Sequence, residues 1–234
     1  MEGVIARPRR GLGLACALVV LGCLGPGEVA TAATVDGRVT DQAGRAVEEA
    51  VVYATREGGG PSPTRPPAGA VMDQQNRMFV PHVLPVDIGV SVSFPNKDNI
   101  RHHVYSFSPP KVFELPLYMG VPATPVVFDK PGVVALGCNI HDWMLAYVYV
   151  VPTPYFAKSN AGGRAQLRDV PPGAYDVRVW HPRMRESPEG TSQRLVLAQS
   201  DTGQAVFVIT LKPERPRRPP SPGGGDYRPP PDPR

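Results

Sequence analysis

The chain has 234 residues, enough for one or two domains, and its 30 prolines and 24 glycines disfavour long helices. The formal net charge of +4 does not indicate nucleic-acid binding, because the excess arginines lie at the two ends of the chain. No cluster of lysine and arginine with interleaved aromatic residues occurs between those ends. We therefore predict an all-β protein built from short strands and many turns.

Residues 1–32 have the features of an export signal peptide. They begin with an arginine-rich stretch, continue with an apolar run over residues 11–24 that is too short to span a bilayer comfortably, and end in the small residues 30–32. A lipoprotein signal that ends at Cys23 is the alternative, although Leu21 fits that pattern poorly. We expect soluble export to the periplasm, with no stable membrane insertion once the peptide is removed.

The next segment, residues 34–57, contains two short apolar runs on either side of a turn, at 35–39 and 50–53. Residues 58–70 are rich in glycine and proline, so we expect a linker there. Apolar residues alternate with serines at 90–94, where a strand would turn the apolar side chains toward a core and the serines toward water. The pattern predicts short strands in this part of the chain.

The most informative motif lies between two apolar runs, at residues 133–136 and 146–151. Cys138, His141 and Met144 place a thiolate, an imidazole and a thioether within one short loop. Two histidines and one cysteine thiolate form a trigonal ligand set for copper, and a weak axial methionine completes it. Zinc makes little use of a thioether, so the motif favours copper over zinc.

Two adjacent residues upstream, His102 and His103, offer the second imidazole. Successive residues of a strand face opposite sides, so only one of them can be a ligand. Cys138 is the only thiol of the exported chain, because Cys16 and Cys23 lie within the predicted signal peptide. A thiol without a disulfide partner in an oxidising compartment indicates a special role, here metal binding, and the alternative is an inert buried cysteine.

Beyond the motif the chain again reads as short strands. Turns at residues 160–163 and 169–173 accompany apolar runs at 175–179 and 205–211. Residues 213–234 are rich in proline, glycine and arginine and contain too little apolar surface to offset the entropy of ordering. We expect a disordered tail there.

The spacing Cys-x2-His-x2-Met, preceded by a more distant histidine, resembles the cupredoxins over residues 72–152, and in particular the plastocyanin/amicyanin-like blue copper proteins. The resemblance implies a Greek-key β-sandwich or barrel for residues 71–152 and one type 1 copper ion. In this family an Asn and then an apolar residue follow the ligand histidine, and that frame favours His102, with His103 in the Asn position. The implied metal ligands are His102, Cys138, His141 and Met144.

Residues 34–57 and 153–212 look like the two halves of a transthyretin-like or carboxypeptidase-regulatory-like β-sandwich. The cupredoxin domain would then be inserted into this second, discontinuous domain. The rival arrangement is an N-terminal extension and a separate C-terminal domain that flank the cupredoxin domain. Exported proteins with this layout are often labelled methylamine utilization proteins on similarity alone, and that pathway is not carried over to this chain.

No constellation for catalysis competes with the copper motif. The sequence has no Ser-His-Asp ordering of any specificity, no phosphate-cradling glycine loop and no paired carboxylates, so we expect no catalytic residues and no enzyme activity. The resemblance implies a carrier of single electrons between redox protein partners in the periplasm, with no nucleic-acid partner. Two alternatives are a copper chaperone or store, and a structural β-sandwich module with a vestigial copper site.

Overall fold

The computed structural model describes residues 1, 3, 32–59, 68–122 and 124–214. The predicted signal peptide, the centre of the predicted linker at 60–67 and the predicted tail from 215 onward lie outside the described residues. Within the described ranges, no helix has the length and apolar character that crossing a membrane requires.

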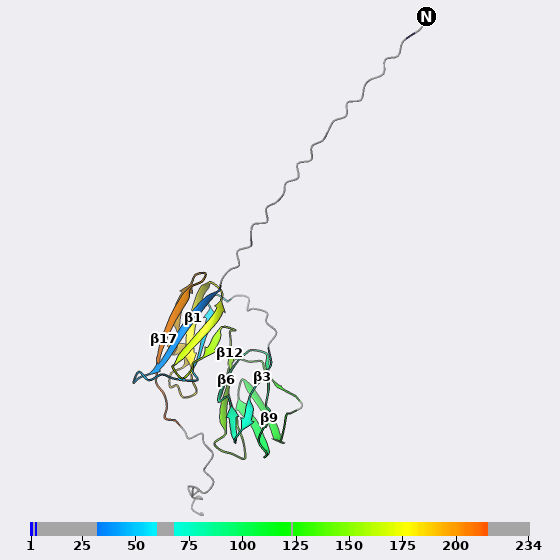
Figure 1. The fold of residues 1–234 in the computed structure, drawn as a ribbon, viewed down its shortest axis with the longest axis vertical. Coiled ribbons are helices and arrows are strands. Elements are labelled where there is room, and N and C mark those ends of the chain that lie inside the picture. Colours follow the sequence, from blue (N-terminus) through cyan, green and yellow to red (C-terminus); the bar gives the residue numbers. More distant parts are fainter. Residues whose placement is uncertain (2, 4–31, 60–67, 123, 215–234) are drawn as a thin grey trace, which may run out of the picture. The chain divides into compact units, whose positions relative to one another are not determined.

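The regular secondary structure of the described residues is almost entirely β-strand, which confirms the predicted fold class (Figure 1). One short 3₁₀ helix, η1 (Pro188–Thr191), accompanies the strands in this part of the chain. The strands form two groups of sheets, each with its own buried core, and the two groups differ in which parts of the sequence contribute to them.

The first group contains a five-stranded sheet in the order β6-β12-β11-β8-β9. Its strands are β6 (Val83–Asp87), β12 (Leu145–Val151), β11 (Gly132–Gly137), β8 (His102–Ser108) and β9 (Lys111–Tyr118). A three-stranded sheet of β10 (Val126–Phe128), β7 (Val90–Ser93) and β3 (Ala70–Val71) accompanies it, with a hairpin of β4 (Asp73–Gln75) and β5 (Met78–Val80). We call this group the first sandwich.

The core of the first sandwich forms because the strands alternate in side-chain character. In β7 the two valines are buried and the two serines are half-buried, as the apolar alternation at 90–94 predicts. Phe94 and Phe128 fill the same core, and Cys138 and Met144 belong to it as well. The candidate ligands therefore lie at the end of a packed core rather than in an open loop.

The second group consists of two further sheets that we call the second sandwich. One has the order β14-β1-β17, with β14 (Arg164–Val170), β1 (Ala33–Asp41) and β17 (Thr202–Ile209). The other has the order β13-β2-β15-β16, with β13 (Phe156–Lys158), β2 (Val51–Arg56), β15 (Gly173–Trp180) and β16 (Gln193–Leu197). Figure 1 shows β1 in blue beside β17 in orange, and the two strands pair in parallel from Thr34↔Thr202 to Asp41↔Ile209.

Strands from both ends of the described chain thus share the sheets of the second sandwich. The first sandwich, from β3 to β12, lies between them in sequence. This pairing is compatible with a discontinuous domain of residues 34–57 plus 153–212 around a domain of residues 71–152, and the division itself stays a prediction.

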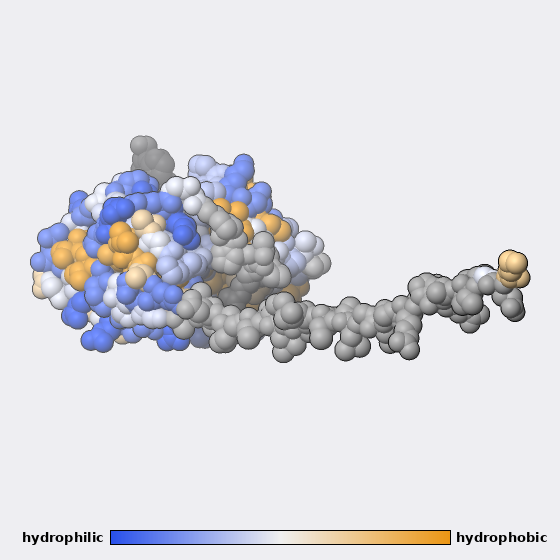
Figure 2. Space-filling model, turned by 90° about the horizontal axis from the view of Figure 1, so that it is seen from above, coloured by the Kyte–Doolittle hydropathy of each residue, from blue (hydrophilic) through white to orange (hydrophobic). Residues whose placement is uncertain are grey.

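A third apolar cluster joins strands of the two groups. Val51, Tyr53 and Trp180 pack with Val83, Tyr149 and Val151. The rings of Tyr149 and Trp180 stack with centroids 4.6 Å apart and planes 23° apart. Strand β12 is consequently buried on both faces, because its even-numbered residues enter the core of the first sandwich and Tyr149 and Val151 enter this cluster. Elsewhere the apolar residues visible at the surface form small patches among hydrophilic ones (Figure 2).

We predict that Trp180→Ala lowers the free energy of unfolding by about 3–5 kcal/mol, because it removes a large buried ring and leaves a cavity against Tyr149. Urea unfolding followed by circular dichroism measures this change. Val196→Ala is the control, because Val196 is 65% exposed and its loss should cost no more than about 0.5 kcal/mol. Equal unfolding midpoints for Trp180→Ala and the wild type would contradict the packing described here.

Candidate metal centre

The first candidate ligand, His102, is the first residue of β8 and is fully buried. Its Nε2 lies 2.7 Å from Oδ2 of Asp98. Its Nδ1 is also buried and has no hydrogen-bond partner among the described residues. One nitrogen of the ring is therefore tied to a carboxylate, and the other is left without a partner from the part of the chain that the structure describes.

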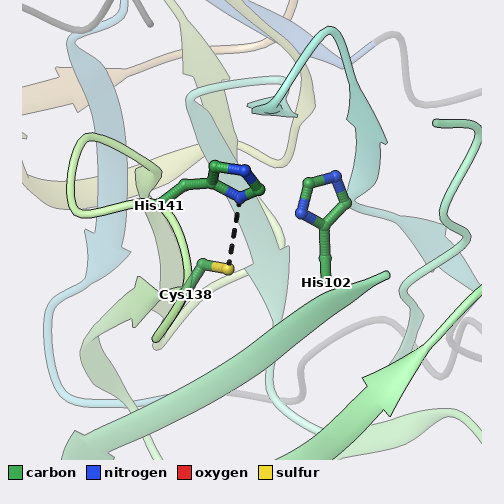
Figure 3. Close-up of side chains that lie close together, drawn as sticks. All are labelled: His102, Cys138 and His141. Atoms are coloured by element: carbon green, nitrogen blue, oxygen red, sulfur yellow. Dashed lines mark hydrogen bonds between the residues drawn. The ribbon is translucent and has the colours of Figure 1, made fainter. Parts of the chain in front are cut away.

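Cys138 and His141 lie on the loop between β11 and β12. Both are buried, and Cys138 Sγ lies 3.9 Å from His141 Nδ1. The potential ligand atoms of His102, Cys138 and His141 all lie within 4.8 Å of one another. Figure 3 shows the two imidazole rings and the sulfur facing a common space, with His102 on β8 and the other two on the loop between β11 and β12.

The fourth candidate, Met144, immediately precedes β12 and is buried. Its backbone N–H donates a hydrogen bond to the carbonyl of His141 at 2.9 Å, which closes a tight turn between the two residues. Met144 shares the core cluster of the first sandwich with Cys138. The thioether is thus in the same buried neighbourhood as the thiol.

His103 lies on the other side of its strand. Its Nε2 is 2.9 Å from Oε1 of Glu114, a distance typical of an ion pair, but the two groups are not aligned as a hydrogen bond. Its ring also contacts Tyr105, with centroids 5.5 Å apart. The structure therefore brings His102, and not His103, together with Cys138 and His141.

Asp98 is a site residue that the sequence analysis missed. It lies in the connection between β7 and β8, and its carboxylate accepts hydrogen bonds from the backbone N–H groups of Asn76 and Arg77 at 2.7 and 2.8 Å. The side chain of Asn96 holds that connection by donating to the carbonyls of Ile100 and Tyr118. The available signal was a carboxylate four residues before His102.

The ring of Trp143 contacts the ring of His141, with centroids 5.1 Å apart. Its indole N–H donates to the carbonyl of Arg77 at 3.0 Å. The β4–β5 turn therefore contacts both parts of the site, because Arg77 binds Asp98 through its N–H and Trp143 through its carbonyl. Asn76 and Arg77 both have positive φ, 54° and 57°, which is the backbone of a two-residue type I′ hairpin turn.

The charges at the site favour metal-binding forms of the histidines. Burial raises the pKa of the Asp98 carboxyl, but hydrogen bonds from His102 and from two backbone N–H groups outweigh burial and leave that pKa below its ordinary value. An ionised carboxylate only accepts, so Nε2 of His102 is the donor in this pair, and in the neutral imidazole Nδ1 then presents a lone pair. Burial, and then the charge that the neighbouring His102 carries when protonated, lower the pKa of His141, which favours the neutral ring that metal binding requires.

These groups fit a copper ion. They offer two buried imidazoles and a buried thiol, with a methionine in the same core, and copper accepts this mixture of nitrogen and soft sulfur donors. The unpaired Nδ1 of His102 is the observation that distinguishes the group from an ordinary satisfied core.

Comparison with known proteins adds the following. No protein-family model and no curated protein sequence matches the chain. Among solved structures, a copper-containing nitrite reductase from Thermus scotoductus SA-01 is 23% identical with a TM-score of 0.34, covering 41% of this chain and 25% of that one.

Two smaller proteins are also similar in structure. A purple cupredoxin from Nitrosopumilus maritimus is 25% identical with a TM-score of 0.31, covering 35% of this chain and 98% of that one. A mutant of amicyanin in its reduced Cu(I) form is 20% identical with a TM-score of 0.33, covering 42% of this chain and 98% of that one. Likenesses this weak assign no function to the chain, so the case for copper depends on the donor groups themselves.

The glycine before the thiol yields a prediction about the packing of the site. A Cβ atom on Gly137 would lie 2.7 Å from Cζ and Oη of Tyr105, the residue directly opposite it on β8. We expect Gly137→Ala to cost about 1–3 kcal/mol of stability by overpacking. In a Tyr105→Ala background the same substitution should cost much less, because the ring that it clashes with is gone. Urea unfolding of the four proteins in the cycle measures the coupling. Additive effects of the two substitutions would show that the contact is absent.

Proposed function

We propose that this protein is an exported carrier of single electrons between periplasmic redox partners, with one type 1 copper ion as its cofactor. The residues that would hold the ion are His102, Cys138, His141 and Met144. The observation that carries the proposal is the buried, unpartnered Nδ1 of His102 beside a buried thiol and a second buried imidazole.

The energetic argument starts from the cost of that arrangement. A buried polar group without a hydrogen bond costs roughly 1–3 kcal/mol, and here the unpaired nitrogen lies next to two other groups with lone pairs. A bound cation would satisfy all three donors at once. Bound copper would supply a one-electron couple, and His, Cys and Met are the side chains that type 1 copper sites use.

The surroundings favour electron transfer over catalysis. His102, Cys138 and Met144 are buried and only 8% of His141 is exposed, so little of the site is open to a substrate. Trp143 packs against His141, and the neighbouring Ile140 is 49% exposed, which gives the surface near His141 an apolar character. In this proposal a redox partner docks there and electrons pass through the ring edge of His141.

Copper loading tests the ligand set. The purified protein should take up one Cu(II) ion per chain and develop an intense thiolate-to-copper absorption band with a narrow copper hyperfine splitting in its EPR spectrum. Cys138→Ser and His102→Ala should abolish the band, because each removes a proposed ligand. His103→Ala is the matched control and should retain it, because His103 faces Glu114. A band that survives His102→Ala but not His103→Ala would overturn the ligand assignment.

Redox cycling separates an electron carrier from a copper store. We expect the loaded protein to be reduced by ascorbate and reoxidised by ferricyanide over repeated cycles, with its copper retained in the presence of a Cu(I) chelator. The physical reason is that the proposed ligands are buried and lie against the core, so the site should keep its copper ion in both oxidation states. Transfer of copper to the chelator within the first cycle would instead favour a chaperone or store.

A further inference from the structure

The carboxylate of Asp98, near the candidate metal centre, is held by three contacts. Its side chain is only 13% exposed and lies against the fully buried ring of His102. Oδ1 accepts from the N–H of Asn76, and Oδ2 accepts from the N–H of Arg77 and lies 2.7 Å from Nε2 of His102. The carboxylate cannot turn away from the ring without giving up these bonds.

The turn that holds Asp98 has a backbone conformation that one of its two residues, Arg77, disfavours. Asn76 and Arg77 both adopt the left-handed region, which asparagine tolerates and which arginine rarely enters. Such conformations persist where surrounding contacts require them. Here the contacts are the two hydrogen bonds to Asp98 and the bond from Trp143 to the carbonyl of Arg77.

We propose that Asp98 is a positioning residue that acts on the candidate copper site through His102. Its carboxylate holds the proton of His102 on Nε2, so that the Nδ1 lone pair points toward Cys138 and His141, and its fixed negative charge lowers the reduction potential of copper bound there. The first effect is a property of the metal-free chain, and the second rests on the proposed function.

The physical argument for the second effect is electrostatic. A negative charge stabilises the more positive Cu(II) state more than the Cu(I) state, and removing that charge should raise the potential. Water and salt screen this charge poorly, because Asp98 is largely buried and His102 is fully buried. Partners that orient a ligating histidine in this way typically change metal affinity about 10- to 100-fold when they are removed, and they raise the basicity of the ligand.

The chain contains a matched control for this proposal. Glu114 pairs with His103, the residue next to His102, but on the opposite side of the strand and with 67% of its side chain exposed. Both pairs join a buried histidine to a carboxylate at almost the same distance, 2.7 Å for Asp98 and 2.9 Å for Glu114. Only the Asp98 pair includes a histidine of the candidate metal group.

The first measurement needs no metal. Long-range proton–nitrogen NMR of the metal-free protein reports which nitrogen of each histidine carries the proton. We expect His102 to be protonated on Nε2 in the wild type and in Glu114→Gln, and to lose that preference in Asp98→Ala. An Nδ1-protonated His102 in the wild type, or an unchanged tautomer in a folded Asp98→Ala variant, overturns the positioning role.

The second measurement uses the copper-loaded protein. Asp98→Asn, which keeps the shape but removes the charge, should raise the reduction potential and weaken Cu(II) binding about 10- to 100-fold, with a smaller effect on Cu(I). Asp98→Glu should return the potential toward that of the wild type, and Glu114→Gln should leave it unchanged. A potential for Asp98→Asn equal to that of the wild type, or a Glu114→Gln shift as large as the Asp98→Asn shift, overturns the electrostatic role.

These results separate the two proposals. If the wild type shows the thiolate-to-copper band and the Asp98 variants leave its potential unmoved, this inference fails and the proposed function stands. If the wild type binds no copper, the proposed function fails, and the tautomer of His102 in the metal-free protein still decides the positioning role. If Asp98→Asn does not fold, the reduction potential of Asp98→Glu tests the electrostatic role, and the tautomer of His102 in the wild type tests the positioning role.

Discussion

The arrangement of the first sandwich depends on one constraint, the burial of two imidazoles and a thiol at the end of a sheet. Each of these groups needs a partner when it leaves water, and the described residues supply only some of these partners. His102 has Asp98 as the partner of one ring nitrogen, and its other ring nitrogen has no hydrogen-bond partner within residues 32–59, 68–122 and 124–214, whereas Cys138 Sγ and His141 Nδ1 lie 3.9 Å apart. The missing partner is the simplest reason to place a metal ion in this space.

The elements around the site reflect the same constraint. Strand β8 delivers His102, and the loop from β11 to β12 delivers Cys138, His141 and Met144. The β4–β5 turn contributes no candidate ligand, but Arg77 in this turn is hydrogen-bonded to Asp98 beside His102 and to Trp143 in the ligand loop. Strand β12 leaves the loop and is buried on both faces, so the end of the ligand loop is anchored by the core of the first sandwich and by the cluster around Trp180.

The sequence was informative where residues with related chemistry lie close together along the chain. Cys138, His141 and Met144 could be recognised together because they lie on one loop, and the alternating residues of β7 predicted a strand with one buried face. The choice of His102 over His103 followed from the residues that come after the ligand histidine in cupredoxins. The structure places His102 beside Cys138 and His141. Asp98 and the β4–β5 turn could not be found in this way, because their contacts with the site depend on how separate loops meet. The cluster around Trp180 was missed for the same reason, since its members come from four different strands.

X-ray absorption at the copper edge tests the central claim most directly, because it counts the atoms bound to the metal. In the Cu(II)-loaded protein the account predicts one short copper–sulfur distance and two imidazole nitrogens, with the short sulfur distance lost in Cys138→Ser. A coordination sphere made only of nitrogen and oxygen atoms would contradict the account, since the metal would then lie away from Cys138 and the unpaired nitrogen of His102 would need another explanation.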